Sequence, residues 1–298
     1  MLRSLGLTLA ALALAVTGCR DNTTNPDMTT VLNDLTMNTS TGDMTCTTNC
    51  GGGMASIHDI DTGVVATGTP GVTISNVVVT GVVYVQGVSK SKHTCEYSAF
   101  VQDPNGPSPS AIKLFATGAT GTLPDGGGTK YTCIEPGKGT TGSPFDSLTA
   151  LLNIGDIVNV TGKTDAFVPS TDAGLSPSQH ELDVTSITFV KSGGVIKPFA
   201  VTDATQFANN GQGFIDHEDE VVTITAAMPT AYPVPDSHGT YTWSGAQFND
   251  TYRYYYDYLG PDAGTFPAAG QTFKSITGVA ELDFGGEILP RTMADFTQ

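Results

Sequence analysis

The feature that most constrains the fold is a series of short β-branched and aromatic segments that begins near Ile57 and continues to the C-terminus. Each segment is rich in Val, Ile, Thr, Phe and Tyr, and Gly, Pro, Asn or Asp precedes the next one. Short apolar runs between turn residues are typical of closely spaced strands. Helical periodicity is scarce, with one candidate over residues 145–152. The sequence therefore predicts an all-β fold.

The predicted strands form two sets that share a motif. Residues 155–162 (GDIVNVTG) match residues 270–278 (GQTFKSITG), with one extra residue in the second copy, which is what a β-bulge produces. A hairpin partner follows each copy, beginning at Glu181 or Glu287. We therefore expect two copies of one five-stranded unit. The predicted strands are 77–85, 98–102, 111–116, 156–164 and 181–190 in the first set, and 220–226, 240–244, 252–259, 272–284 and 287–289 in the second.

The N-terminus has the layout of a secretory signal: Arg3, an apolar run, and small residues before Cys19. The run is shorter than the about 20 apolar residues of a membrane-spanning helix. The ending AVTGC resembles the lipobox of bacterial lipoproteins, which implies that residues 1–18 are a lipoprotein signal peptide. It also implies that Cys19 is the mature N-terminus and carries acyl chains such as palmitate. A plain signal peptide that happens to contain a cysteine is the alternative.

Residues 19–56 are rich in Thr, Asn, Asp, Met and Gly and contain no aromatic residue, so we expect a flexible, disordered tether. Arg20 follows the cysteine, where the inner-membrane retention signal of such lipoproteins has Asp. The expected location is therefore the cell envelope, lipid-anchored, at the outer membrane. The membrane is the first expected partner, through the lipid anchor.

Four segments resemble the OB-fold-like region found upstream of the catalytic domain in bacterial extracellular nucleases. Similar modules occur in surface lipoproteins that lack the nuclease. The segments are residues 100–106 (FVQDPNG), 155–162, 273–279 (FKSITGV) and 289–296 (LPRTMADF).

The resemblance implies two tandem five-stranded OB-like barrels, over residues 57–193 and 194–298, without the catalytic domain. The sequence departs from the family pattern at Glu218-Asp219, where Glu-Gly is typical, and in a long insertion around Cys133. We expect no catalytic residue, no cofactor and no metal. The expected protein is therefore not an enzyme.

Charge argues against nucleic acid as the partner. After removal of the signal peptide the chain has 12 Lys and Arg against 29 Asp and Glu, a formal net charge of −17. Such a surface repels phosphate backbones. The one basic cluster comprises Lys90, Lys92 and His93, before Cys95.

Four cysteines remain besides Cys19, an even number that favours disulfides in an oxidising compartment. Of the three possible connectivities we prefer Cys95 with Cys133 and Cys46 with Cys50. A zinc site built from Cys46, Cys50 and a nearby histidine lacks a fourth ligand and the usual paired spacing.

Residues 216–220 (DHEDE) concentrate acidic oxygens. They lack the alternating spacing of a dedicated calcium loop and lie where a strand starts. We interpret this run as a solvated charge cluster.

The segment 251–260 (TYRYYYDYLG) is the strongest candidate for a ligand face. As a strand, the third of the second unit, it would place four tyrosines on one side, because side chains alternate. Cross-strand packing of these rings with Trp243 and Phe248 is the structural alternative. The candidate face comprises Tyr252, Tyr254, Tyr256, Tyr258 and Trp243.

Two functions are compatible with these observations. The first is a non-enzymatic envelope lipoprotein whose OB-like modules bind or scaffold an extracellular glycan or protein. The alternative is an accessory single-stranded nucleic-acid binder, or a partner of a secreted nuclease.

Overall fold

The structure is a computed structural model, and it describes residues 53–89, 94–120, 152–167, 178–236, 239–250, 267–282 and 285–298. Residues 45–298 form one compact unit. It contains two β-sheets, so the prediction of an all-β fold is confirmed. None of the helices in the described ranges is long and apolar enough to cross a membrane.

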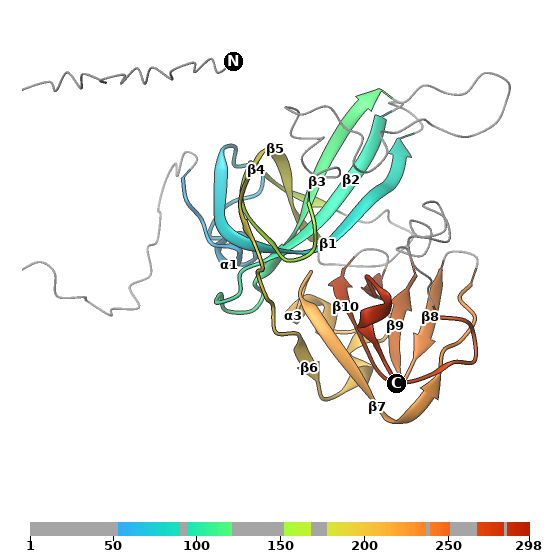
Figure 1. The fold of residues 1–298 in the computed structure, drawn as a ribbon. Helices are drawn as coiled ribbons and strands as arrows, with labels where there is room; N and C mark the ends of the chain where they lie inside the picture. The colour runs from blue at the N-terminus through green and yellow to red at the C-terminus, as the bar shows by residue number, and fades with distance from the viewer. Residues whose placement is uncertain are drawn as a thin grey trace, which may run out of the picture. The chain divides into compact units, whose positions relative to one another are not determined.

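Module 1 is a closed five-stranded barrel (Figure 1) with the order β1-β2-β3-β5-β4. All its strand pairs are antiparallel except β3 with β5. This is the Greek-key order of an OB-fold. The strands are β1 (Val72–Ser89), β2 (Thr94–Gln102), β3 (Ala111–Thr120), β4 (Asp156–Phe167) and β5 (Gln179–Ser192).

A short helix, α1 (Ile57–Asp61), precedes the barrel. Ser56 and Asp59 form a capping box that satisfies donors at its first turn. Ile57 and Ile60 pack into the barrel core. The last residue of the helix, Asp61, has a buried side chain.

Module 2 repeats the strand order of module 1. Its sheet runs β6-β7-β10-β11-β9-β8, in which β9 and β11 are the parallel pair that corresponds to β3 and β5. The strands are β6 (Phe199–Val201), β7 (Val221–Ala231), β8 (Thr240–Trp243), β9 (Ala246–Asn249), β10 (Thr272–Glu281), β11 (Glu287–Leu289) and β12 (Phe296–Thr297). Three short helices complete it: η2 (Ala204–Phe207), α3 (Gly213–Asp216) and η5 (Met293–Asp295).

Module 2 differs from the predicted second barrel in its closure. In the described residues no backbone pairing joins β7 to β8. The indole Nε1 of Trp243 in β8 instead donates to the carbonyl of Thr230 in β7, at 3.2 Å. A side chain therefore bridges the seam that backbone pairing closes in module 1.

The shared sequence motif occupies equivalent places in the two modules. Gly155 and Gly270 both have φ of 90° and precede the fourth strand of their module. A Cβ on Gly162 would lie 2.5 Å from the carbonyl oxygen of Asp183, and one on Gly278 would meet the fifth strand of module 2 in the same way. The motif therefore marks a turn and a close approach of two strands.

The sequence predicted one extra residue within residues 270–278, and the structure has a register shift next to Phe273. Phe273 pairs with Thr230 and Ser275 with Thr225, so that Lys274 lies opposite residues 226–229. The additional residues thus belong to β7 and not to β10. Phe273 and Ile276 are three residues apart, yet both side chains are buried, because the register shift between them changes which residues face the core.

Candidate functional site

The candidate site begins where the outer face of β2 and β3 meets module 2. In β2, Ala99 and Val101 point into the barrel core, so Phe100 between them points outward. Phe100 is nevertheless completely buried, because it packs against Val221 and two other apolar side chains of module 2. An outward residue of the barrel is therefore part of a second core, which we call the junction.

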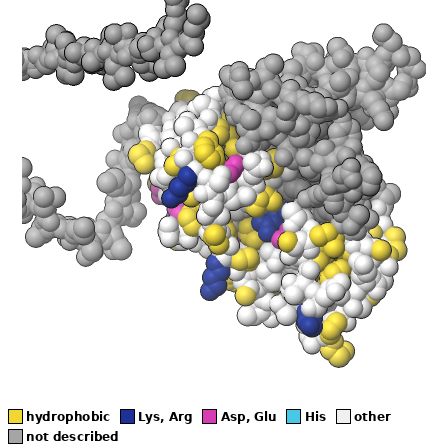
Figure 2. All heavy atoms as spheres, viewed as in Figure 1, with side chains coloured by type: hydrophobic (Ala, Val, Ile, Leu, Met, Phe, Trp, Pro, Cys, Tyr) yellow, Lys and Arg dark blue, Asp and Glu magenta, His cyan; other side chains and the backbone are white. Residues whose placement is uncertain are grey.

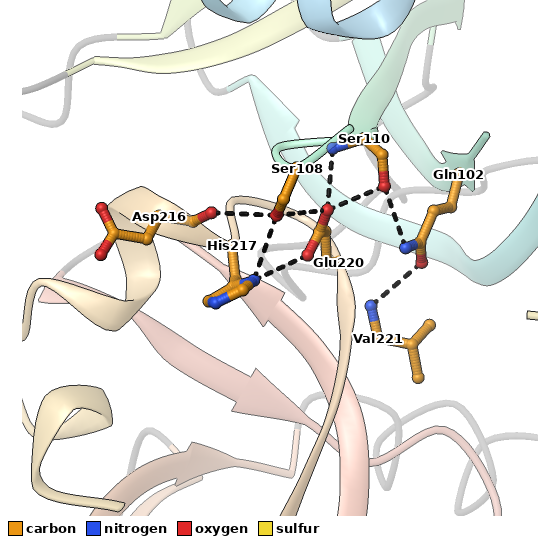
Figure 3. Close-up of polar contacts among 7 residues, drawn as sticks. All are labelled: Gln102, Ser108, Ser110, Asp216, His217, Glu220 and Val221. Carbon is orange, nitrogen blue, oxygen red and sulfur yellow. Dashed lines mark hydrogen bonds and ion pairs between the residues drawn. The ribbon is translucent and has the colours of Figure 1, made fainter. Parts of the chain in front are cut away.

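Polar side chains surround this apolar contact, and Figure 3 shows one half of them. Glu220 Oε1 accepts from the Ser110 backbone N–H and hydroxyl and from the Ser108 hydroxyl, each at 2.8 Å. The Val221 N–H donates to Gln102 Oε1 at 3.2 Å. Burial raises the pKa of Glu220, but the hydrogen bonds from His217, Ser110 and Ser108 outweigh it and lower the pKa overall. Glu220 is thus a charged acceptor that ties the two modules together.

Ser108, His217 and Glu220 form a group that resembles a nucleophilic triad in composition only. The Ser108 hydroxyl and Glu220 Oε2 both approach Nδ1 of His217, at 3.2 and 2.8 Å. A triad needs the serine and the acid on opposite ring nitrogens, so that the histidine can relay a proton. This arrangement holds the serine in place and does not activate it.

The other half of the junction centres on Lys113. Its side chain points out of the barrel and is 2% exposed, and Nζ lies 2.8 Å from Glu281 and 3.4 Å from Glu181. Gln179 Nε2 donates to Asp219 Oδ1 at 2.8 Å. The pKa of Asp219 is raised by burial and by neighbouring carboxylates, although Lys113 opposes the shift. Burial likewise raises the pKa of Glu181.

A third group lies beside helix α1. Glu218 accepts from the backbone N–H of His180, and its Oε2 lies 3.2 Å from Nδ1 of the same histidine. Asp61 Oδ1 is 3.9 Å from that nitrogen, and neither oxygen of Asp61 has a hydrogen-bond donor. Burial, followed by the charges of Glu218 and Glu220, raises the pKa of Asp61 to about 9.

The interpretation of residues 216–220 as a solvated cluster is wrong. Glu218, Asp219 and Glu220 are at most 4% exposed, because they fill the junction. One signal in the sequence could have shown this. Asp219 stands where the resembling family has Gly, and its φ is 59°, a conformation that glycine adopts without cost. A charged residue at a glycine position therefore pointed to a structural demand.

Module 2 has an outer face of its own on β8 and β9. Tyr241, Trp243, Ala246 and Phe248 pack into the module 2 core. Their alternates, which include Thr242 and Gln247, lie on the opposite side, where Thr242 is exposed. We call the set Thr240, Thr242, Gln247, Asn249 and Glu287 the β8–β9 face.

Glu287 borders the β8–β9 face from β11. The Thr240 hydroxyl lies 2.6 Å from Glu287 Oε1. Burial raises the pKa of Glu287 to about 7, although hydrogen bonds from Thr240, Asn249 and Gln247 oppose the shift. The face therefore offers hydroxyl, amide and carboxyl groups.

The candidate ligand residues of the sequence analysis are not brought together in the described structure. Trp243 is 1% exposed and packs edge-on against Phe248, so it belongs to the core and not to a ligand face. Tyr252, Tyr254, Tyr256 and Tyr258 lie outside the described residues, and β9 takes the place of third strand that we predicted for their segment. Cys19, Cys46, Cys50, Cys133 and the basic residues Lys90, Lys92 and His93 also lie outside, whereas the backbone of Cys95 belongs to β2.

Arg291 pairs with Asp295 near the C-terminal end of module 2. Its guanidinium makes a paired contact with Asp295, with Nη2 to Oδ1 at 2.7 Å and Nε to Oδ2 at 3.1 Å. Nη1 also donates to the Thr80 carbonyl of module 1 at 2.9 Å. A pocket of about 210 Å³ lies beside it, smaller than the about 300–1,000 Å³ of usual small-molecule sites.

No metal centre is evident in the parts of the chain that are described, since no three His, Cys, Asp or Glu side chains gather suitably there. The view in Figure 2 shows described Lys and Arg side chains scattered singly over that face. That view therefore offers no continuous basic surface for a phosphate backbone.

The strand order assigns both modules to the OB-fold topology, and comparison with solved structures finds an OB domain and two aspartyl-tRNA synthetases at low similarity. A putative aspartyl-tRNA synthetase from Leishmania major has a TM-score of 0.28 and 13% identity, over 78% of this chain and 48% of that one. An OB domain from Thermoplasma acidophilum has a TM-score of 0.24 and 15% identity, and the match covers 50% of this chain and 94% of that one. Aspartyl-tRNA synthetase from Entamoeba histolytica has a TM-score of 0.21 and 14% identity, and the match covers 43% of this chain and 20% of that one. No family model and no curated protein matches the chain. With TM-scores this low, the assignment rests on the strand order itself.

Proposed function

We propose that this protein is a non-enzymatic binding and scaffolding protein of the cell envelope, which presents its ligand face on module 2. The observation that carries the proposal is the burial of Phe100, Gln102 and Lys113 on the outer side of β2 and β3. OB-folds bind ligands on the face of their second and third strands. In module 1 this surface contacts module 2, so ligand binding falls to the β8–β9 face.

The chemistry of the β8–β9 face favours a glycan as the extracellular ligand. A protein surface is the second possible ligand, because it also carries hydroxyl and amide groups. Hydroxyl, amide and carboxyl groups pair with sugar hydroxyls, and Thr242 is exposed to make such contacts. The net charge of −17 for the mature chain repels phosphate groups. The lipobox resemblance supports anchoring through Cys19 at the outer membrane.

Affinity electrophoresis of the mature chain tests this proposal. The Cys19→Ser form is run through gels that contain neutral polysaccharides, and we expect at least one of them to retard it. Thr242→Arg with Gln247→Ala should weaken the retardation by about tenfold, because each lost hydrogen bond to a sugar is worth about 1 kcal/mol. Lys163→Ala, on the exposed surface of module 1, is the matched control, and its retardation relative to a gel without polysaccharide should equal that of the wild type.

The alternative is an accessory single-stranded nucleic-acid binder or a partner of a secreted nuclease, and the nuclease-region resemblance favours it. Labelled single-stranded DNA at about 20 mM salt is the discriminating probe, because phosphate contacts are strongest at low salt. Micromolar or tighter DNA binding together with unretarded migration in every polysaccharide gel would replace our proposal with this one.

A further inference from the structure

We propose that the junction is a pH-sensitive latch, which holds module 1 against module 2 while Asp61 is a neutral acid and loosens as that group ionises. This inference deepens the proposed function, because the latch controls whether the β2–β3 face of module 1 is covered. It rests on contacts across the junction and on the position of one carboxyl group.

The position of Asp61 is the first observation. Its side chain is 1% exposed, and within the described ranges neither carboxyl oxygen receives a hydrogen bond. A buried carboxylate without donors is costly, whereas the neutral acid is not. Ionisation of Asp61 is therefore favourable only where water can reach it, which requires the junction to open.

The charges that face Asp61 come from both modules. His180 at the start of β5 is the nearest, and Glu218 and Glu220 face it from the segment between α3 and β7. Glu218 accepts from the backbone N–H of His180 and lies 3.2 Å from its Nδ1, whereas Asp61 is farther from that nitrogen, at 3.9 Å. A negative charge on Asp61 would therefore meet two carboxylates across the junction and push the modules apart.

A second carboxyl group near Lys113 acts in the same sense. Asp219 is completely buried, and its Oδ2 has no donor. Lys113 is the cation for Asp219, Glu181 and Glu281 together. Among the described residues, this part of the junction thus places three carboxyl groups around one lysine, and protonation of Asp219 lowers the negative charge there.

The direction of the pH effect follows from linkage. The pKa of Asp61 is about 9 in the closed junction and has its ordinary value of 3.8 once exposed. Between these values the closed form holds one more proton, so the opening constant rises about tenfold per pH unit. The latch is tightest near pH 4, loosens through neutral pH and changes no further above about pH 9.

The other groups shift this profile in known directions. Burial raises the pKa of Asp219 and Glu181, so they loosen the junction in the same direction as Asp61. The hydrogen bond to Glu218 raises the pKa of His180, which adds a further loss as pH rises through that value. The pKa of Glu220 is lowered, so its contribution is lost only at acidic pH. The contribution of Asp61 to the pH dependence must therefore be separated from the others by comparison of the wild type with an Asp61 variant.

Amide hydrogen exchange of the full protein measures the opening of the junction and needs no ligand. Three amides donate to side chains across the junction: His180 to Glu218, Ser110 to Glu220, and Val221 to Gln102. Their protection factors, corrected for the intrinsic exchange rate, are compared between pH 5 and 8.5 in the wild type and Asp61→Asn. Strand residues Val158 and Val160 of β4 report on module 1 itself.

We expect the protection of the three junction amides to fall more steeply with pH in the wild type than in Asp61→Asn, by about tenfold per pH unit. Val158 and Val160 should show equal slopes in both proteins. Asp165→Asn changes an exposed aspartate of module 1 and should keep the wild-type slope. Equal slopes at the junction amides in the wild type and Asp61→Asn would overturn the proposal, as would a flattened slope in Asp165→Asn.

A direct titration keeps the test decisive if Asp61→Asn does not fold. The carbon chemical shift of the Asp61 carboxyl in the wild type should show its midpoint above pH 7, and a midpoint near 4 would refute the latch. Because neither measurement uses a ligand, failure of the latch and failure of glycan binding are separate results.

Discussion

At the scale of single residues, the junction depends on side chains that a sequence pattern places wrongly. Lys113 and Asp219 are ionisable residues, a type that sequence reasoning assigns to the surface, yet both are at most 2% exposed. Each is buried because the other module supplies partners, such as Glu281 for Lys113. Partners so far away along the chain leave no local signal, which is why the polar half of the site was not predicted.

Replacement of Asp219 by glycine should stabilise the protein at neutral and alkaline pH. The φ of 59° costs a non-glycine residue about 1–2 kcal/mol, and the substitution also removes a buried carboxyl group. We therefore expect a gain of about 1–2 kcal/mol in the free energy of unfolding at pH 8, measured by urea denaturation. Because burial raises the pKa of Asp219, its ionisation costs stability as pH rises, so the gain should shrink towards pH 4.

Asp219→Asn separates the two contributions, since asparagine tolerates positive φ and carries no charge. It should reproduce the pH dependence of the glycine variant with a smaller gain. A glycine variant less stable than the wild type at pH 8 would show that the contacts of Asp219 with Gln179 and Lys113 outweigh its strain.

At the scale of elements, the sequence predicted most of the fold, because the pattern that identifies a strand lies within the strand and its flanking turns. Alternating apolar residues and flanking glycines located all five strands of module 1. They also located β7, β8, β10 and β11 of module 2. The third strand of module 2 was missed because the aromatic segment 252–259 has the higher strand propensity, whereas β9 (Ala246–Asn249) is short and pairs through its hairpin with β8.

The contact between β8 and β11 gives a pH prediction for module 2. Burial raises the pKa of Glu287 to about 7, so the stability it supports is complete below its ordinary value of 4.5 and is lost as pH rises to about 7. The loss should amount to at most about 3 kcal/mol. Glu287→Gln keeps an acceptor for the Thr240 hydroxyl without the charge. The variant should match the wild type near pH 4.5 and be more stable at pH 8 in thermal unfolding.

Asp103→Asn removes a carboxylate from a turn of module 1 and serves as the control, because it should not reproduce the gain in stability of Glu287→Gln at pH 8. A Glu287→Gln variant that unfolds at the wild-type temperature at pH 8 would contradict a buried, ionising Glu287.

At the scale of the whole molecule, one barrel order is used twice for two purposes. Module 1 closes its barrel and buries its outer β2–β3 surface in the junction, whereas the β8–β9 face of module 2 has an exposed residue, Thr242. Repeat matching in the sequence predicted the duplication, because the glycines of residues 155–162 and 270–278 serve the same turns. It could not predict the asymmetry, which depends on what the outward residues meet after folding.

The coupling of the two modules through Phe100 can be measured by calorimetry. Phe100 is completely buried and joins β2 of module 1 to Val221, Val279 and Leu289 of module 2. Phe100→Ala leaves a cavity that should cost about 3–5 kcal/mol. Since that cavity lies in the junction, we expect the wild type to unfold in one transition and Phe100→Ala to unfold in two. Phe207→Ala opens a similar cavity inside the module 2 core and should lower stability while the modules remain coupled at the junction. One transition in Phe100→Ala would mean that the polar contacts of Glu220 and Lys113 are sufficient to couple the modules.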